Sequence, residues 1–503
     1  MTGKIREIDE SLSIRGGELY IEGCRATRLV ELFGSPLFVV SEDQLRRNLN
    51  RYRKAFESRW SEGPVNILPA IKANTSLATR KVLTEEGAGC DVFSPGELYA
   101  ALKTGTKPEL ISVNGGGKSA AHIRNCIKSG VRITVDDIDE IDLIEREARG
   151  LRKKAWIRLR LRPDFPNLWQ PTGFANEMAP IDLGFQIYKS GIPTEHVYGI
   201  GKRAIESPHL ELVGLHLHIG RHHYRMAFWR GVIKGYVKLI AELREKWGGW
   251  LPKELDIGGG IPSPRYPFGQ MWNKLDELMY FVFWFVLILL KLLGTRLRYK
   301  IVSAALGLVM EKKQRNRKIP SIEQYAEEIT TTLRRAFKKY KIDPKGMAIQ
   351  IEPGRSLYGN ASVHLSKVLS TKYQRSPIAY NWVILDTSYF FLTGGVIEQN
   401  FYNFLVANKA DAKAVKFADI CGRSCFADRL VPEVRIPDIK AGDVIAVLDT
   451  GAYQENSASN FNSMPRPASV MVKGNTAAVI KRAETEKDVF ARDIIPKKMI
   501  RVV

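Results

Sequence analysis

A lysine, a run of glycines and a glutamate stand where separate apolar runs of strand length end. Lys72 ends VNILPAIK, Gly258–Gly260 end ELDIGGG, and Glu352 lies near the end of MAIQIEPG. A desolvated lysine near other positive groups can lose its proton and form an imine. Glycine N–H groups let an anion such as a phosphate approach closely. A glutamate can keep a pyridinium nitrogen protonated. Together these residues indicate a pyridoxal phosphate (PLP) site rather than a metal site.

Other polar residues stand at the ends of similar runs. Asp91 lies within GCDVFS, Asn114 follows LISV, His218 follows ELVGLHL, and Arg355 follows IEPG. A single lysine or histidine at such a position is more often structural. Polar groups that gather at the carboxyl ends of parallel strands are instead typical of an active site. The flat imidazole of His218 is suited to stacking on the ring of the cofactor.

The runs themselves repeat along the chain and are mostly separated by helical patterns such as SPGELYAALKTG. Eight strands that alternate with helices predict an α/β fold, a (β/α)8 TIM barrel. The predicted strands are Val65–Lys72, Gly89–Ser94, Leu110–Gly115, Arg132–Asp137, Ala155–Pro163, Glu211–Gly220, Glu254–Gly260 and Met347–Gly354.

The pattern changes after the barrel. NWVILDT, AVKFADICG, AGDVIAVLDTGAY and ASVMVKG are short strands with turn signals, and LSIRGGELYIEG near the start has the same character. We therefore expect residues 1–37 to join the β domain and residues 38–360 to form the PLP-binding barrel, with a hydrophobic and basic insertion at about 265–320. Residues 361–503 are expected to form a C-terminal β-barrel or sandwich domain.

The insertion does not suit a soluble barrel. Leu278–Leu293 is almost wholly apolar, and a basic stretch with Arg296, Arg298 and Lys300 follows it. As a helix it would reach roughly 24 Å, short of the ~30 Å hydrocarbon core of a bilayer. This predicts peripheral contact of residues 278–318 with an anionic membrane surface. The alternative is a helix buried against the barrel or in an oligomer interface.

The charge and the cysteine content indicate which ligands and which cellular compartment suit this chain. The 76 Lys and Arg residues against 54 Asp and Glu give a net charge of +22, which favours an anionic ligand or surface, but no nucleic-acid motif accompanies it. The five cysteines show no CxxC pair or zinc spacing. The opening MTGKIREIDESL has no apolar signal core. We expect a cytoplasmic protein, peripheral on the inner face of the cytoplasmic membrane if the insertion binds it.

The motifs resemble those of the fold-type III PLP decarboxylases, the diaminopimelate/ornithine decarboxylase family, and above all its diaminopimelate branch. The resemblance covers nearly the whole chain apart from the insertion. The segments that carry it are FGSPLFVVSEDQLRRN, AIKANTS, EEGAGCDVFSPGELYAAL, LHLHIG, LDIGGGIP, IEPGRSLYGNA and DTGAYQENSASNFNSMPRPASVMV.

This resemblance implies an alanine-racemase-like form of the barrel and roles for its residues. Lys72 matches the Schiff-base lysine, His218 the histidine that stacks on the cofactor ring, and Glu352 the partner of the pyridine nitrogen. Asp91 and Glu97 match the pair beside the Schiff base.

Further roles follow from the same resemblance. Gly258–Gly260, Arg355 and Tyr453 match positions that bind the cofactor phosphate, and Arg355 also faces the substrate. Cys425 resembles the catalytic cysteine, which donates a proton in the active site of a neighbouring subunit. A homodimer with shared active sites is therefore implied.

The chain departs from the family around the distal end of the substrate. Phe426 stands where the family has an acidic residue, and Tyr402 is kept in EQNFY while Glu398 replaces an arginine. Arg221 replaces a phosphate-binding serine after HIG. A substrate ammonium buried against Phe426 would lack a partner, at a cost on the order of several kcal/mol. With Arg355, Tyr402 and Phe426 are the expected substrate-binding residues.

We therefore expect a PLP-dependent carboxy-lyase that removes CO2 from an amino acid and protonates Cα. The departures favour an amino acid linked to a membrane or lipid over a simple diamino acid. Alternatives are a true diaminopimelate decarboxylase of lysine biosynthesis, a non-catalytic homologue that binds a partner, and a racemase with Cys425 as second base.

Overall fold

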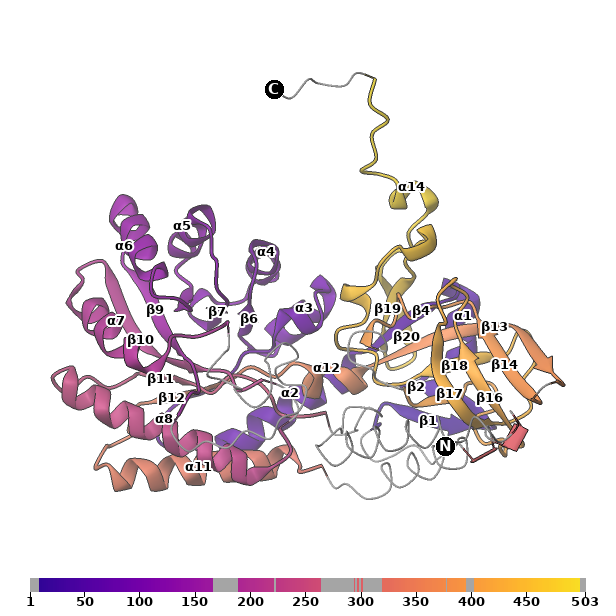
Figure 1. The fold of residues 1–503 in the computed structure, drawn as a ribbon, viewed down its shortest axis with the longest axis horizontal. Helices are drawn as coiled ribbons and strands as arrows, with labels where there is room; N and C mark the ends of the chain where they lie inside the picture. The colour runs from indigo at the N-terminus through magenta and orange to yellow at the C-terminus, as the bar shows by residue number, and fades with distance from the viewer. Residues whose placement is uncertain are drawn as a thin grey trace. The chain divides into compact units, whose positions relative to one another are not determined.

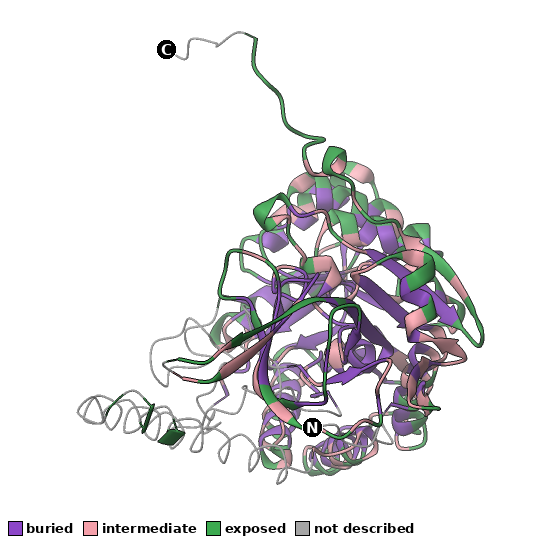
Figure 2. Cartoon of the chain, turned by 90° about the vertical axis from the view of Figure 1, so that its right-hand side faces the viewer, coloured by how far each residue is buried: buried purple, intermediate pink, exposed green. Residues whose placement is uncertain are grey.

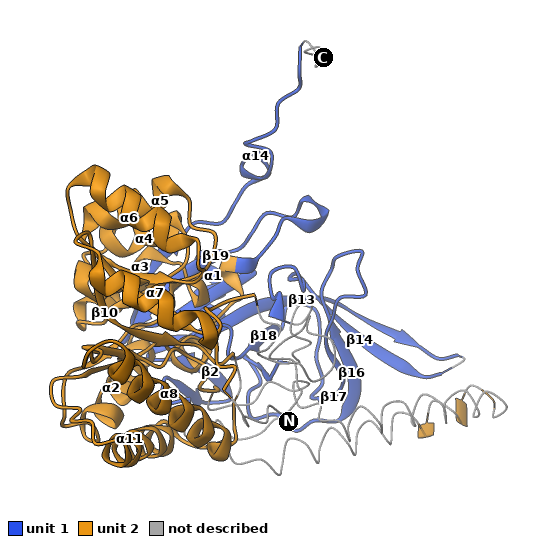
Figure 3. Cartoon of the chain, turned by 60° about the vertical axis from the view of Figure 1, so that its left-hand side comes forward, with its two compact units in different colours: residues 1–41, 362–450, 457–503 blue, residues 42–361, 451–456 orange. Residues whose placement is uncertain are grey.

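The computed structural model describes residues 9–165, 189–220, 223–263, 294, 296–297, 300–301, 319–376, 378–394 and 402–497. The chain forms two compact units (Figure 3). Unit 1 comprises Met1–Ser41, Ser362–Thr450 and Ser457–Val503, and unit 2 comprises Glu42–Ala361 and Gly451–Asn456. The expected domain boundary at residue 38 falls inside strand β4 (Leu37–Ser41) of unit 1.

Unit 2 contains one parallel sheet of eight strands in the order β5-β12-β11-β10-β9-β8-β7-β6. An isolated parallel bridge between Ala70 and Asp91 links its two ends, so the sheet nearly closes. This confirms the predicted barrel (Figure 1). The strands are β5 (Val65–Ile67), β6 (Cys90–Val92), β7 (Ile111–Val113), β8 (Arg132–Val135), β9 (Ala155–Leu161), β10 (Leu210–Leu217), β11 (Glu254–Asp256) and β12 (Ala348–Ile351).

The barrel strands are short and apolar. They are buried, as Figure 2 shows, because helices cover the outside of a parallel sheet. Ser94 caps the helix after β6 by accepting from the backbone N–H of Glu97. The helices are α2 (Glu42–Glu57), α3 (Leu77–Glu85), α4 (Pro95–Lys103), α5 (Ala120–Ser129), α6 (Glu140–Leu151), α7 (Thr194–Glu206), α8 (Met226–Lys246), α11 (Ile322–Lys339) and α12 (Arg355–Tyr358).

Unit 1 is mostly β structure and confirms the predicted β domain. Strands β1 (Leu12–Arg15), β2 (Glu18–Ile21) and β3 (Cys24–Arg25) form a small sheet, followed by α1 (Ala26–Phe33). A larger sheet contains β4, β13 (Ser362–Gln374), β14 (Tyr380–Leu385), β15 (Phe404–Val406), β16 (Lys416–Cys421), β17 (Arg429–Ile436), β18 (Val444–Val447), β19 (Ala468–Lys473) and β20 (Thr476–Lys481).

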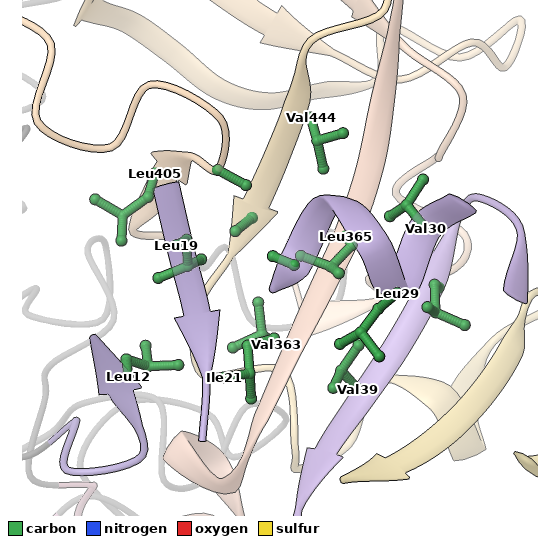
Figure 4. Packing of buried hydrophobic residues seen from close by; sticks show 14 of the residues in the cluster. Leu12, Leu19, Ile21, Leu29, Val30, Val39, Val363, Leu365, Leu405 and Val444 are labelled. Atoms are coloured by element: carbon green, nitrogen blue, oxygen red, sulfur yellow. The ribbon is translucent and has the colours of Figure 1, made fainter. Parts of the chain in front are cut away.

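Segments distant in the sequence meet in the core of unit 1. Leu19, Leu29, Val39 and Val363 pack together there, as Figure 4 shows. Strand β4 pairs with β13 and with β19, so the N-terminal segment is built into the larger sheet.

The predicted membrane contact rests on residues that the structure does not place. Leu278–Leu293 and nearly all of the 265–320 insertion lie outside the described residues. Among the helices that the structure does describe, none combines the length and apolar character needed to cross a membrane.

Candidate active site

Lys72 lies in a short 3-10 turn, Ile71–Ala73, beyond strand β5. The sequence predicted that the strand runs to Lys72, but it ends at Ile67. Two contacts from the segment Gly451–Asn456 hold the turn. The side chain of Asn456 donates to the carbonyl of Lys72 at 2.6 Å, and the backbone N–H of Tyr453 donates to the carbonyl of Ala73 at 2.8 Å. No spacing in the sequence identifies Asn456.

The amine of Lys72 forms a hydrogen-bonded ion pair with the carboxylate of Asp91. Burial acts against a charged amine, but Asp91, Tyr453 and Glu352 outweigh it and raise the pKa of Lys72. The expectation of a neutral lysine among positive groups is therefore wrong for this state, because the nearest charge is negative. Lys72 must lose a proton before it can form an imine.

Asp91 connects Lys72 to Glu352 through one amide. Asn114 donates from Nδ2 to Asp91 Oδ1 at 2.7 Å and to Glu352 Oε1 at 2.7 Å. Asp91 lies in β6, Asn114 follows β7 and Glu352 follows β12, so three strand ends supply the chain of contacts. The structure brings these three predicted residues together at one end of the barrel.

Glu352 is buried, with only 4% of its surface exposed, and both carboxylate oxygens have partners. Oε1 also accepts from the hydroxyl of Ser112 at 3.4 Å, and Oε2 lies 3.3 Å from His216 Nε2. Burial alone would raise the pKa of Glu352. The hydrogen bond with His216 and the positive charge of Lys72 outweigh burial and hold this pKa below its usual value. Glu352 is thus an anion that could pair with a protonated ring nitrogen.

The glycine turn follows β11 and has no room for side chains. A Cβ on Gly258 would lie 2.3 Å from the carbonyl oxygen of Leu217, and one on Gly259 would lie 2.6 Å from that of Glu352. Gly258 and Gly260 also have φ values of +66° and +96°, which favour glycine. Asp256 Oδ1 accepts from the N–H of Gly258 at 2.9 Å and fixes the turn. Such a bare backbone suits the close approach of a phosphate.

His218 lies beside this turn, since the N–H of Gly259 donates to His218 Nδ1 at 3.3 Å. Burial together with the positive charges of Arg160 and Lys72 lowers the pKa of His218 well below its usual value. The ring is therefore a neutral, flat surface at neutral pH, which fits the predicted stacking on a cofactor ring.

Arg355 and Tyr453 pair on the same unit, with the guanidinium of Arg355 5.0 Å from the centre of the Tyr453 ring. Arg355 opens α12, directly after β12, and Tyr453 has a left-handed φ of +61°. A Cβ on Gly354 would lie 2.6 Å from the Tyr453 hydroxyl oxygen.

Glu97 is the first-turn acid of α4. Its carboxylate accepts from the N–H of Phe93 at 2.6 Å, while burial and Asp91 raise the pKa of Glu97.

A further polar group inside the barrel has no predicted role. Arg158 is fully buried and pairs through Nη1 with Asp256 Oδ2 at 2.6 Å. Burial and Glu352 raise the pKa of Asp256 well above its usual value. The ligand atoms of His216, Asp256 and Glu352 lie within 4.8 Å of one another, but the carboxylate oxygens are already engaged by the hydrogen bonds above.

The remaining predicted residues lie in unit 1. The N–H of Cys425 donates to Asn462 Oδ1 at 3.0 Å, and Asn462 Nδ2 donates to Cys425 Sγ at 3.3 Å. Phe426 is 48% exposed. Tyr402 is buried in the core of the unit, where its hydroxyl donates to the carbonyl of Leu392 at 3.1 Å. Arg221 and Glu398, which mark two departures from the family, lie outside the described residues.

The comparisons with known proteins agree with this geometry. A family model for "Pyridoxal-dependent decarboxylase, pyridoxal binding domain" matches residues 42–284. Diaminopimelate decarboxylase of Archaeoglobus fulgidus is 28% identical over 97% of this chain and 100% of its own length. That of Aquifex aeolicus is 29% identical over 95% of this chain and 96% of its own.

Solved structures are similar over the same length. Diaminopimelate decarboxylase from M. jannaschii superposes with a TM-score of 0.79 at 25% identity, covering 97% of this chain and 99% of that one. A second structure of that enzyme, in co-complex with L-lysine, gives the same values.

The residues of unit 2 fit PLP by three independent features. They provide an amine that can form an imine, a buried carboxylate anion and a glycine turn in which any Cβ would collide with a backbone oxygen. With the family match and the full-length relatives, these features identify the chain as a PLP-dependent carboxy-lyase that is similar to the fold-type III decarboxylases, in particular to diaminopimelate decarboxylases.

Proposed function

We propose that this chain decarboxylates diaminopimelate and that Lys72 holds the cofactor as a Schiff base. The observation that carries this proposal is the hydrogen-bonded chain from Lys72 through Asp91 and Asn114 to Glu352, in a barrel that aligns over nearly its full length with diaminopimelate decarboxylases. These relatives favour diaminopimelate over the lipid-linked amino acid that the sequence departures suggested.

Each residue of the site has a task in this proposal. PLP, when bound, supplies an electron sink for the pair left by the departing CO2. Asp91 holds the proton of Lys72 while that amine is free, and Glu352 provides the negative charge opposite the ring nitrogen. His218 presents a neutral face to the ring. The glycine turn, with Arg355 and Tyr453 beside it, binds the phosphate.

We further propose that Cys425 donates the proton to Cα in the active site of a second copy, which makes the enzyme a homodimer. The loop that carries Cys425 is closed by Asp428, whose Oδ2 accepts from the N–H of Ser424 at 2.9 Å and from its hydroxyl at 2.6 Å. Asn462 then holds Cys425 from two sides. This support keeps the thiol in one position, as a proton donor needs.

A substrate with an apolar chain is the second candidate. Phe426 contacts Phe390 edge-on with ring centres 5.8 Å apart, and Phe390 stacks on Phe461 at 4.0 Å. Phe426, an exposed member of this cluster, directly follows Cys425 in the chain. It offers no carboxylate to a distal ammonium but could contact an acyl chain.

CO2 release from the purified enzyme with added PLP tests both candidates. The substrates are meso-diaminopimelate, L-lysine, L-ornithine and vesicles that contain phosphatidylserine. We expect turnover of diaminopimelate, and loss of both turnover and the borohydride-sensitive visible band in Lys72→Ala. Turnover of the phosphatidylserine vesicles without turnover of diaminopimelate would support the second candidate and overturn the first.

A further inference from the structure

His216 is a buried histidine that the roles above leave unassigned. It lies near the end of β10, two residues before His218, and 1% of its surface is exposed. Its side chain reaches the interior of the barrel, where Nε2 lies 3.3 Å from Glu352 Oε2. The other nitrogen, Nδ1, has no hydrogen-bonding partner among the described residues.

This arrangement is costly for a residue that serves packing alone. A buried imidazole with one nitrogen unpaired loses the hydration of that nitrogen, whereas an aliphatic side chain of similar volume would not. The only hydrogen bond of the His216 side chain within the described residues is the one to Glu352. Whatever His216 contributes beyond packing therefore acts through that carboxylate.

We propose that His216 is the positioning residue of Glu352. Its Nε2–H holds carboxylate oxygen Oε2, while Asn114 and Ser112 hold Oε1, so the carboxylate cannot rotate. His216 thereby keeps Glu352 in the orientation and anionic state that would stabilise a protonated ring nitrogen of PLP. This inference rests on the proposed role of Glu352 as partner of that nitrogen.

The charges that face His216 are consistent with a neutral donor. Burial lowers the pKa of His216, and Arg158 and Arg160 on β9 act in the same direction, while Glu352 opposes them. Asp256 on β11 also lies beside the pair. The imidazole is therefore neutral and Glu352 anionic at neutral pH. A neutral N–H donor on one oxygen leaves the negative charge of Glu352 available to the ring.

Two substitutions separate the hydrogen bond from packing. His216→Met fills a similar volume without a donor, and His216→Gln keeps an N–H donor. His122→Met is the matched control, because His122 is also buried in unit 2 but its side chain contacts Cys126 on its own helix. Far-UV circular dichroism checks that each variant folds, and His216→Leu replaces His216→Met if the latter does not.

The direct readout is nitrogen NMR of enzyme loaded with PLP that carries an isotope label in the ring nitrogen. In His216→Met we expect the resonance to move toward that of an unprotonated pyridine, and kcat to fall about 10- to 100-fold, the range for loss of a hydrogen bond to a charged group. His216→Gln should restore most of both values, and His122→Met should behave like the wild type.

A double-substitution cycle tests whether His216 acts through Glu352. In a Glu352→Gln background, His216→Met should add little further loss of kcat, because the group it positions is already neutral. Additive losses, or a ring nitrogen that stays protonated in His216→Met, would overturn the proposal. Failure of the proposed function looks different: PLP binds with a protonated ring, but diaminopimelate is not decarboxylated by the wild type.

Discussion

Two opposing effects act on the pKa of Lys72, and the contact with Asp91 decides its direction. Desolvation favours the neutral amine that imine formation needs, but the adjacent carboxylate favours the ammonium. The outcome is a raised pKa, so the free enzyme stores a proton on Lys72. The pKa of Lys72 can be altered through Asp91, because Asp91 carries the adjacent negative charge. The same carboxylate also accepts a hydrogen bond from Asn114.

Replacement of Asp91 by asparagine should lower the pKa of Lys72. The neutral amine would then be present at lower pH, so the pH midpoint for attachment of PLP to the apoenzyme should move to lower pH. Stopped-flow recording of the visible band across a pH series measures this shift. Asp343→Asn, an exposed position next to the end of α11, should leave the midpoint unchanged. A midpoint that moves upward would contradict the assignment of Asp91.

At the scale of elements, the turn after β11 depends on the absence of side chains. A Cβ on Gly259 would meet the carbonyl oxygen of Glu352 at 2.6 Å, and both groups belong to strand ends that cannot shift independently. A methyl group there would push the glycine turn away from β12. The phosphate site and the carboxylate would then lose their relative geometry.

Gly259→Ala should therefore weaken PLP binding by more than about tenfold and lower the free energy of unfolding by about 1–3 kcal/mol. Gly199→Ala is the matched control, because a Cβ there meets nothing within 4 Å and the position lies inside helix α7. It should be neutral or raise the stability by up to about 1 kcal/mol. PLP titration and urea unfolding measure both effects. Equal PLP affinity in the two variants would argue against a role for the turn.

At the scale of the whole molecule, each unit buries a histidine that is neutral when folded. Burial lowers the pKa of His223 in unit 2 to about 4 and that of His364 in unit 1 to about 3. An unfolded histidine has a pKa of about 6.5, so below that pH the unfolded chain binds protons that the folded chain does not. Stability is then complete above about pH 6.5 and is lost as the pH falls toward about 4 and 3.

Both units should lose on the order of a few kcal/mol of stability between about pH 7 and about pH 4, since one pKa unit is worth about 1.4 kcal/mol. Paired carboxylates such as Glu323 and Glu484, with pKa values lowered to about 2, stabilise the fold above about pH 4 and lose this contribution only as the pH falls toward about 2. Guanidinium unfolding at several pH values measures the loss. His364→Gln should reduce it for unit 1 alone, and an unchanged pH dependence would contradict the assignment.

The proposed dimer makes a prediction about mixtures of subunits. Lys72→Ala and Cys425→Ala should each be nearly inactive as homodimers. If each active site takes Lys72 from one copy and Cys425 from the other, mixed dimers contain one intact site. Unfolding and refolding the two variants together should then restore roughly a quarter of wild-type activity. No recovery in a mixture shown by mass to contain mixed dimers would place both residues in one copy.

The sequence by itself determined the barrel, the β domain and the residue types of the site. Regular alternation of apolar runs and helices is a local pattern, and residues at strand ends such as Asp91, Asn114 and Glu352 must meet once parallel strands align. The glycine run predicted a turn that an anion can approach closely, because glycine has no side chain. The substrate-binding roles of Tyr402 and Phe426 stay predictions, and the buried hydroxyl of Tyr402 is engaged within unit 1.

Only the tertiary structure decided the charge on Lys72, the support from Asn456 and the contact between His216 and Glu352. Asn456 reaches the carbonyl of Lys72 across 384 positions, and such long-range pairings leave no periodic signal in the chain. A pKa depends on which charges lie within a few ångströms and how far water is excluded. These conditions exist only after the strands have closed around the site, so residue types alone could not supply them.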